Sequence, residues 1–198
     1  KVLGEGEGLL GKWVPVEGWG IPPADLLKVP GFRQPKDADI AQAKKLLAEA
    51  GYPNGFDLTI LSRTNAITRN SSVFMSGQLN TIGIKAKVEV LEDAIFWDRG
   101  RKATFDSMVF TPTMVIPDVW AMGRYFVPGA AVNYTGNDDD KKLGDLWTQQ
   151  VRATDPATRH ALVLEAEKYL LEEALPAVPI AWPYLFLAAW PDVRGFSP

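Results

Sequence analysis

The sequence predicts an α/β fold in which helices flank a mostly parallel sheet. Three short apolar or alternating segments are typical of strands, at 56–61, 84–90 and 108–110. Two stretches with helical character separate them, at 65–82 and 93–101. Strands that alternate with helices of this length are typical of βαβ units with right-handed connections. The middle of the chain is therefore expected to contain a βαβαβ core.

Local signals define the elements of this core. In the segment 84–90 apolar residues alternate with charged ones, which predicts a strand with one solvated face. The run 108–110 is apolar throughout, which predicts a strand buried on both faces. Asn65 or a neighbouring residue is expected to begin the first helix, with Val73 among its buried residues. Asp93 is expected to cap the second helix.

A further helix is predicted ahead of the core, from about residue 39 to residue 50. Asp39 is expected to cap it, and Gln42 completes the pattern of a capping box. Apolar residues recur within it at spacings of three and four, which indicates one buried stripe. Gly51 is expected to end the helix.

Glycine and proline dominate residues 1–36, so no regular element can run far through them. We expect an extended segment that packs on the rest of the domain through Trp13 and Trp19. The pattern G-x-G-x-x-G at 6–11 lacks the preceding strand and the following helix that a dinucleotide site needs. We therefore interpret it as extended, glycine-rich chain.

The part of the chain after the sheet is predicted to be largely helical. Helices are expected at 118–126, 140–153 and 155–174. Asn137 or Asp138 is expected to cap the second of them, and Asp155 the third, where proline follows at the first helical position. Short apolar segments within 177–189 are interrupted by prolines, which confines them to irregular or edge strands.

Composition excludes several classes of site. The 198 residues contain no cysteine and one histidine, His160, so disulfides, thiolate metal sites and multi-histidine metal sites are excluded. The net charge of −3 and the lack of a basic patch argue against a nucleic-acid partner. The acidic run 138–140 lacks the spacing of a calcium loop and is explained by the helix that follows it. We expect no metal and no cofactor.

Candidate ligand-binding residues lie after the predicted strands, because open α/β sheets bind ligands beyond the carboxyl ends of their strands. Arg63 follows the first strand, and its guanidinium is suited to pair with a carboxylate. The other candidates follow the third strand and the next helix: Phe110, Thr111, Thr113, Trp120, Asn133 and Tyr134. These residues offer aromatic and polar contacts but no set of nucleophile, base and orienting group. We therefore expect a binding protein and not an enzyme.

Several motifs resemble, in the same order, those of the extracellular solute-binding proteins of family 5, the dipeptide-, oligopeptide- and nickel-type receptors of ABC importers. Residues 43–56 read AKKLLAEAGYPNGF and resemble the family signature A-K-x-L-L-x-E-A-G-Y-P-x-G-F. Looser matches follow at 78–84, 105–108, 133–143 and 173–179. The resemblance covers roughly residues 30–195.

The resemblance implies a periplasmic-binding-protein-like lobe, the second large lobe of a longer receptor. The expected parts are the Gly/Pro-rich segment at 1–36, the solute-binding lobe at 37–190 and the start of a return segment at 191–198. The implied partners are a small solute, peptide-like or carboxylate-bearing, the membrane subunits of an ABC permease and the missing first lobe. The implied location is periplasmic or extracellular, either free or lipid-anchored. Three tryptophans are expected to face the missing lobe: Trp13, Trp19 and Trp190.

One position departs from the pattern of peptide-binding relatives. These carry an acidic residue in the loop after the third strand that holds the amino group of the peptide, and Thr113 stands near that position here. Arg63 falls close to where some relatives place a carboxylate-binding arginine. An alternative role is the ligand-sensing domain of a cytoplasmic transcriptional regulator, because similar lobes occur fused to DNA-binding regions.

Overall fold

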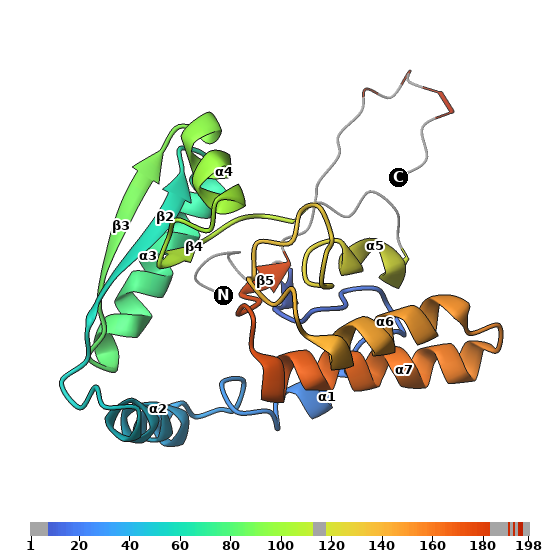
Figure 1. Ribbon diagram of the computed structural model, residues 1–198, viewed down its shortest axis with the longest axis horizontal. Helices are drawn as coiled ribbons and strands as arrows, with labels where there is room; N and C mark the ends of the chain where they lie inside the picture. The colour runs from blue at the N-terminus through green and yellow to red at the C-terminus, as the bar shows by residue number, and fades with distance from the viewer. Residues whose placement is uncertain (1–7, 113–117, 183–189, 191, 193, 196–198) are drawn as a thin grey trace.

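Two regions lie side by side in the molecule, a small sheet with its helices and a largely helical region (Figure 1). The computed structural model describes residues 8–112, 118–182, 190, 192, 194 and 195. None of the helices in this part of the chain has the length and apolar character needed to cross a membrane.

The sheet is parallel, as predicted. Its central strand, β2 (Asp57–Arg63), pairs with β3 (Lys85–Leu91) on one side and with β4 (Ser107–Met108) on the other. The prediction of a fully buried strand at 108–110 is wrong. β4 is a two-residue strand whose side chains are only partly buried, because β2 is its sole neighbour in the described sheet.

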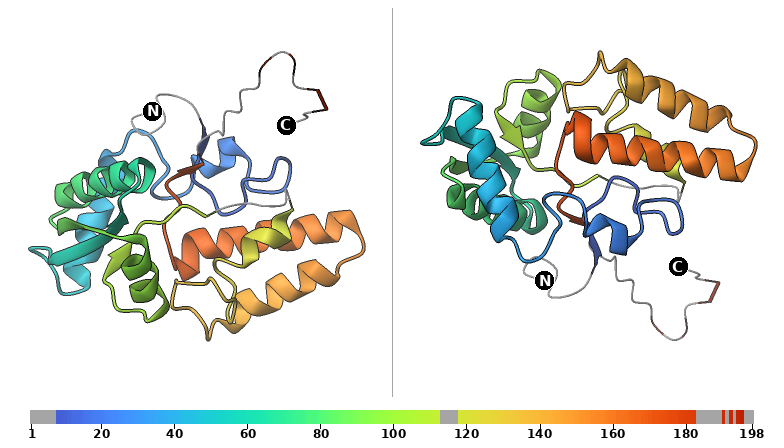
Figure 2. Two further views of the ribbon diagram at one scale, coloured as in Figure 1. Left: turned by 90° about the horizontal axis from the view of Figure 1, so that it is seen from above. Right: turned by 90° about the horizontal axis from the view of Figure 1, so that it is seen from below.

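Helices α3 (Ala66–Thr81) and α4 (Asp93–Arg101) connect the strands and lie on opposite faces of the sheet (Figure 2). Right-handed connections that run in opposite directions along the sheet require this placement. Helix α3 starts next to Asn65, as predicted, and the structure shows that Asn65 caps it: its Oδ1 accepts a hydrogen bond from the backbone N of Thr68 at 3.1 Å. Asp93 is the first residue of α4 and not its cap. Its carboxylate is therefore available to another partner.

The buried face of α3 is small and polar. Thr68 and Ser72 are fully buried, and the Ser72 hydroxyl donates to the carbonyl of Thr68 at 2.8 Å. The Ser76 hydroxyl donates to the carbonyl of Ala86 in β3 at 2.7 Å, which ties the helix to the sheet. Val73 was expected to be buried but is 59% exposed, because the hydroxyl-bearing residues occupy the face toward the sheet.

Helix α2 (Asp37–Glu49) begins before its predicted cap. The carboxylate of Asp39 does not cap it, because it accepts hydrogen bonds from Gly31 N at 2.9 Å and from Arg33 Nε at 2.7 Å. The predicted end is confirmed: Gly51 follows the helix with a φ of 90°, a conformation that glycine adopts without steric cost.

The helical region contains α5 (Val119–Gly123), α6 (Lys141–Arg152) and α7 (Pro156–Tyr169), and α7 runs on as a π-helical turn at Leu170–Ala174. Helices α6 and α7 lie side by side in both Figure 1 and Figure 2. A short helix, α1 (Pro23–Leu26), precedes them in the chain.

An aspartate side chain caps each of the helices α5, α6 and α7. The carboxylates of Asp118 and Asp155 accept from the backbone of α5 and α7, and the cap of α7 is as predicted. The prediction of Asn137 or Asp138 as the cap of α6 is wrong, because Asp140 accepts from the N-terminus of that helix instead. The Asn137 amide donates to the chain just after α5, so it holds the loop between the two helices.

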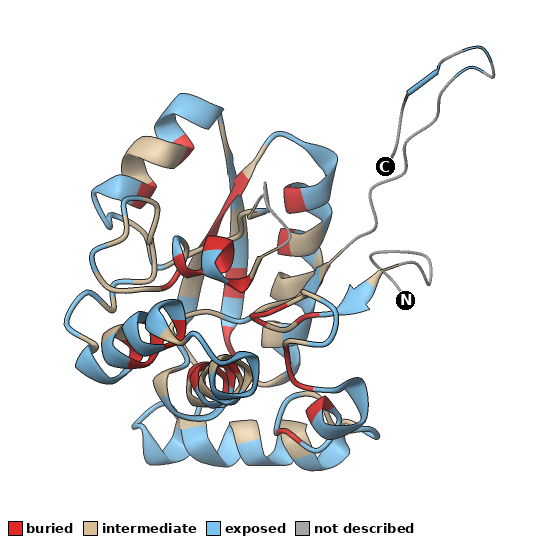
Figure 3. Ribbon diagram, turned by 90° about the vertical axis from the view of Figure 1, so that its right-hand side faces the viewer, coloured by how far each residue is buried: buried red, intermediate tan, exposed pale blue. Residues whose placement is uncertain are grey.

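The Gly/Pro-rich segment forms part of the hydrophobic core of the helical region. Trp13, Val14 and Ile21 are 8%, 1% and 2% exposed. The ring of Trp13 meets Phe126 edge-on with centroids 5.0 Å apart. Trp13 therefore does not face a missing lobe, contrary to expectation, whereas Trp190 is 81% exposed. Figure 3 shows the buried positions gathered where the helices face one another and on the central strand.

A buried carboxylate fixes this segment to α7. Glu167 accepts a hydrogen bond from Val14 N at 2.7 Å and another from Ile21 N at 2.5 Å. Burial raises the pKa of the Glu167 carboxyl, although these hydrogen bonds act in the opposite direction. The carboxylate thus supplies acceptors to a segment that has few backbone partners of its own.

Two segments far apart in the sequence form a second, antiparallel pair of strands. β1 (Leu9–Leu10) pairs with β5 (Ala181–Trp182), and the indole of Trp182 donates to the carbonyl of Lys12 at 2.7 Å. The described part of the glycine pattern at 6–11 thus contains a strand, and no nucleotide-binding helix follows it. The rest of the predicted apolar tail, 183–189, lies outside the described residues.

Candidate functional site

The site is built around Arg63, the last residue of β2. Its Nε donates to Oδ1 of Asp93 at 2.8 Å, and its Nη2 pairs with the other carboxylate oxygen. Asp93 reaches it from the first turn of α4, which follows the neighbouring strand β3. The Arg63 hydrogen bond holds the pKa of the Asp93 carboxyl below its ordinary value, and Asp93 in turn raises the pKa of Arg63. Both groups are therefore ionised at neutral pH.

An aromatic cluster extends from this ion pair. The guanidinium carbon of Arg63 lies 5.3 Å from the ring centre of Trp97, on α4. Trp97 lies 5.6 Å from Tyr134 and 6.4 Å from Phe110, and Phe110 lies 6.1 Å from Tyr125. We call these four rings the aromatic cluster. All four are partly exposed, so the cluster is neither a closed core nor a bare surface.

Three of the predicted ligand-binding residues meet in this arrangement: Arg63, Phe110 and Tyr134. The residue that joins them is Trp97, which the sequence reasoning missed together with Asp93. The available signal was the i, i+4 spacing of Asp93 and Trp97 directly after a strand of the parallel sheet, which places both on one face of α4.

The other predicted residues near this end of the sheet have different outcomes. Thr111 is exposed beside Phe110, and Thr113 lies outside the described residues. The Asn133 amide donates to Val127 O at 3.1 Å and to Asn137 Oδ1 at 2.9 Å, and its oxygen accepts from the Thr135 backbone. Asn133 thus shapes the loop that carries the neighbouring Tyr134.

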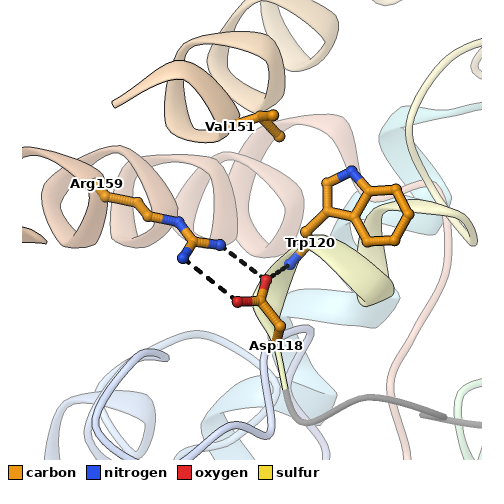
Figure 4. A pocket seen from close by; sticks show the side chains of 4 residues that line it. All are labelled: Asp118, Trp120, Val151 and Arg159. Atoms are coloured by element: carbon orange, nitrogen blue, oxygen red, sulfur yellow. Dashed lines mark hydrogen bonds and ion pairs between the residues drawn. The ribbon is translucent and has the colours of Figure 1, made fainter. Parts of the chain in front are cut away.

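Trp120 belongs to a second surface. It lines an open pocket with Asp118, Val151 and Arg159 (Figure 4). Arg159 Nη2 donates to Asp118 Oδ1 at 2.8 Å, and this contact lowers the pKa of the Asp118 carboxyl. Arg159 also lies over the ring of Trp19 at 4.9 Å. Trp120 itself is 57% exposed, and its pocket is formed with α6 and α7 rather than with the sheet.

Three carboxylates near these surfaces are each engaged by other groups of the protein. Asp93 and Asp118 are each held ionised by an arginine, so neither is poised to exchange a proton near neutral pH. Glu167 has a raised pKa, but its oxygens are turned to the backbone of the N-terminal segment. In the described part of the chain, no group of three or more His, Asp or Glu side chains is placed to hold a metal ion.

Comparison with known proteins gives consistent results. Residues 9–157 match the family model of bacterial extracellular solute-binding proteins, family 5 Middle. The glutathione-binding protein GsiB of Shigella flexneri is 28% identical over 187 residues, which cover 89% of this chain and 36% of that protein. The chain therefore spans about a third of the length of the curated relatives it matches.

Solved structures show the same likeness. A dipeptide-binding protein of Pseudoalteromonas sp. SM9913, in complex with Met-Leu, superposes with a TM-score of 0.74 at 26% identity, over 90% of this chain and 35% of that one. The periplasmic binding protein DppA of Helicobacter pylori, in complex with the peptide STSA, gives 0.68 at 27% identity over 90% and 34%. The predicted α/β lobe of the periplasmic-binding-protein type is confirmed. The chain belongs to the bacterial extracellular solute-binding proteins of family 5.

Proposed function

We propose that this chain is a solute-binding lobe of an ABC importer receptor, which captures a small solute between two lobes and delivers it to a membrane permease. The observation that carries the proposal is the aromatic cluster with Arg63, which lies beyond the carboxyl ends of the parallel strands in a chain of this family. Ligands of open α/β sheets bind at that end. The receptor would work in the periplasm or outside the cell, either free or lipid-anchored.

The proposed solute is peptide-like. Glutathione, Met-Leu and the peptide STSA, which name the ligands of the relatives, all contain peptide bonds. The aromatic cluster supplies apolar contact area, and Arg63 supplies hydrogen-bond donors. Thr113 stands near the position where peptide-binding relatives carry an acidic residue, and its hydroxyl carries no charge. The residue that would bind a free amino group of the solute is therefore left open. The family relatives do not favour the alternative role of a cytoplasmic sensor.

A thermal-shift assay on the full-length receptor tests the proposal. A panel of peptides, glutathione, sugars and metal chelates is added at a large excess. A solute at 100 times its dissociation constant should stabilise the receptor by about 2.7 kcal/mol. A receptor whose melting temperature no member of the panel changes would refute the role.

Two aromatic variants locate the site. Phe110→Ala removes a ring of the aromatic cluster and should lower the affinity for the solute that the panel identifies. Trp120→Ala removes an exposed ring from the other surface and serves as the matched control. Both variants are first compared with the parent for their melting temperature without solute. The reverse outcome, with affinity lost only in Trp120→Ala, would place the site at the pocket beside Arg159.

A further inference from the structure

The guanidinium of Arg63 is only partly used by Asp93. An arginine presents five N–H donors in one plane. Asp93 takes the edge formed by Nε and Nη2, and Nη1 has no hydrogen-bond partner among the described residues. The Arg63 side chain is 24% exposed and that of Asp93 is 54% exposed. Arg63 is therefore partly exposed and retains N–H donors that no described residue uses.

Two further ion pairs involve helix α4 and its C-terminal end. On α4 and the adjacent strand, Arg99 pairs with Glu89 at 2.9 Å and Lys102 pairs with Asp98 at 2.8 Å. Arg63 faces the carboxylate of Asp93 and the ring of Trp97, which is uncharged. The positive charges of Arg63, Arg99 and Lys102 are thus each paired with a carboxylate.

We propose that Asp93 is a specificity-determining residue, which makes Arg63 a donor to an uncharged oxygen of the solute and not to a carboxylate. A carbonyl, amide or hydroxyl oxygen can accept from Nη1 with the Asp93 contact intact. A carboxylate would share one guanidinium with Asp93, and like charges so close together oppose binding. The inference rests on the proposed function, since it takes the solute to lie against the aromatic cluster.

The inference narrows the solute class. A peptide-like solute would turn an amide or hydroxyl oxygen toward Arg63 and place any free carboxylate elsewhere. This differs from the simpler expectation that Arg63 holds a carboxylate. Trp97 supports the arrangement, because a guanidinium stacked on an indole and bound by a carboxylate has little freedom to swing toward another anion.

The experiment compares acetate with acetamide, which have nearly the same shape and differ in charge. Each is titrated at constant ionic strength into the 198-residue chain and into Asp93→Asn, and NMR follows the Nε–H signal of Arg63. The matched control is Asp98→Asn, which removes one negative charge from the same helix without touching Arg63. The fold of each variant is checked by its melting temperature.

The wild-type chain and Asp98→Asn should bind acetate no more tightly than acetamide. Asp93→Asn should shift the preference toward acetate by on the order of tenfold, the factor that one close charge contact commonly makes. A wild-type chain that prefers acetate, or an Asp93→Asn variant with an unchanged ratio, would overturn the inference. An unresponsive Asp93→Asn variant would overturn it too. Neither acetate nor acetamide depends on knowing the physiological solute. A negative result in the solute panel, which tests the proposed function, is therefore distinguishable from an unchanged acetate preference in Asp93→Asn, which tests this inference.

Discussion

Replacing Gly123 by alanine should destabilise the protein, because α5 and α6 approach each other closely at this residue. A Cβ atom on Gly123 would lie 2.1 Å from Nε1 and 2.4 Å from Cε2 of Trp147. The indole cannot withdraw easily, since Trp147 is 5% exposed and meets Phe126 edge-on with centroids 4.9 Å apart. Overpacking of this kind costs about 1–3 kcal/mol.

Gly144 provides the matched control. It lies within α6, and a Cβ there would meet no atom within 4 Å. Alanine in place of glycine within a helix stabilises by about 0.5–1 kcal/mol. The same chemical change should therefore have opposite signs at the two positions, with a difference between the variants of about 1.5–4 kcal/mol.

Urea unfolding followed by tryptophan fluorescence measures both variants. Gly123→Ala should also melt lower than the parent by roughly 2–12 °C, given the usual relation for domains of this size. A Gly123→Ala variant as stable as Gly144→Ala would refute the reasoning, because it would mean that Trp147 has room to move.

Three further outcomes are expected. Glu167→Ala leaves two buried backbone donors without acceptors, so it should lower the free energy of unfolding in urea by about 2 kcal/mol or more. Glu165→Ala, an exposed change on the same helix, should lower it by less than about 0.5 kcal/mol. Equal losses of stability in the two variants would contradict this reasoning. The pKa of Asp118 is lowered in the folded protein, so its ion pair stabilises the fold at pH values above the ordinary pKa of 3.8. This stabilisation is lost as the pH falls through the lowered pKa, so the difference in unfolding free energy between the parent and Asp118→Asn should shrink on acidification. A difference independent of pH would argue against the ion pair. If the proposed two-lobed receptor is correct, calorimetry should find that the 198-residue chain binds the solute more weakly than the full-length protein, because a single lobe would supply only part of the contacts. Equal affinity would disprove the two-lobe reasoning.

Sequence reasoning predicted the sheet, the start of α3 and the cap of α7 because those signals are local. The alternation at 84–90 reports directly on a strand with one solvated face. The side chains of Asn65 and Asp155 accept hydrogen bonds from backbone groups three residues further on. Asp39 was mistaken for a cap because its competing partner, Arg33, belongs to a segment with no regular pattern. The same irregularity hid the burial of Trp13, which depends on packing against residues far along the chain.

The candidate site was predictable in part for the same reason. Arg63 and Phe110 follow strands, so the general rule for ligand positions in parallel sheets finds them. Asp93 escaped because its contact with Arg63 depends on β3 lying next to β2, and an amino-acid sequence states the strand order only indirectly. Trp97 escaped because an aromatic residue on a helix is most often part of a core.

The hydrogen bonds from Val14 and Ile21 to the Glu167 carboxylate have a consequence for the order of folding. These two hydrogen bonds join residues 153 and 146 positions apart, and the bond from Trp182 to Lys12 spans 170. The three described strands of the parallel sheet, by contrast, include no residue beyond 108. Contacts between distant positions form slowly, because a long loop must close before they contribute. The sheet region is therefore expected to fold while the chain is still being synthesised, and the helical region only after residue 182 has been made.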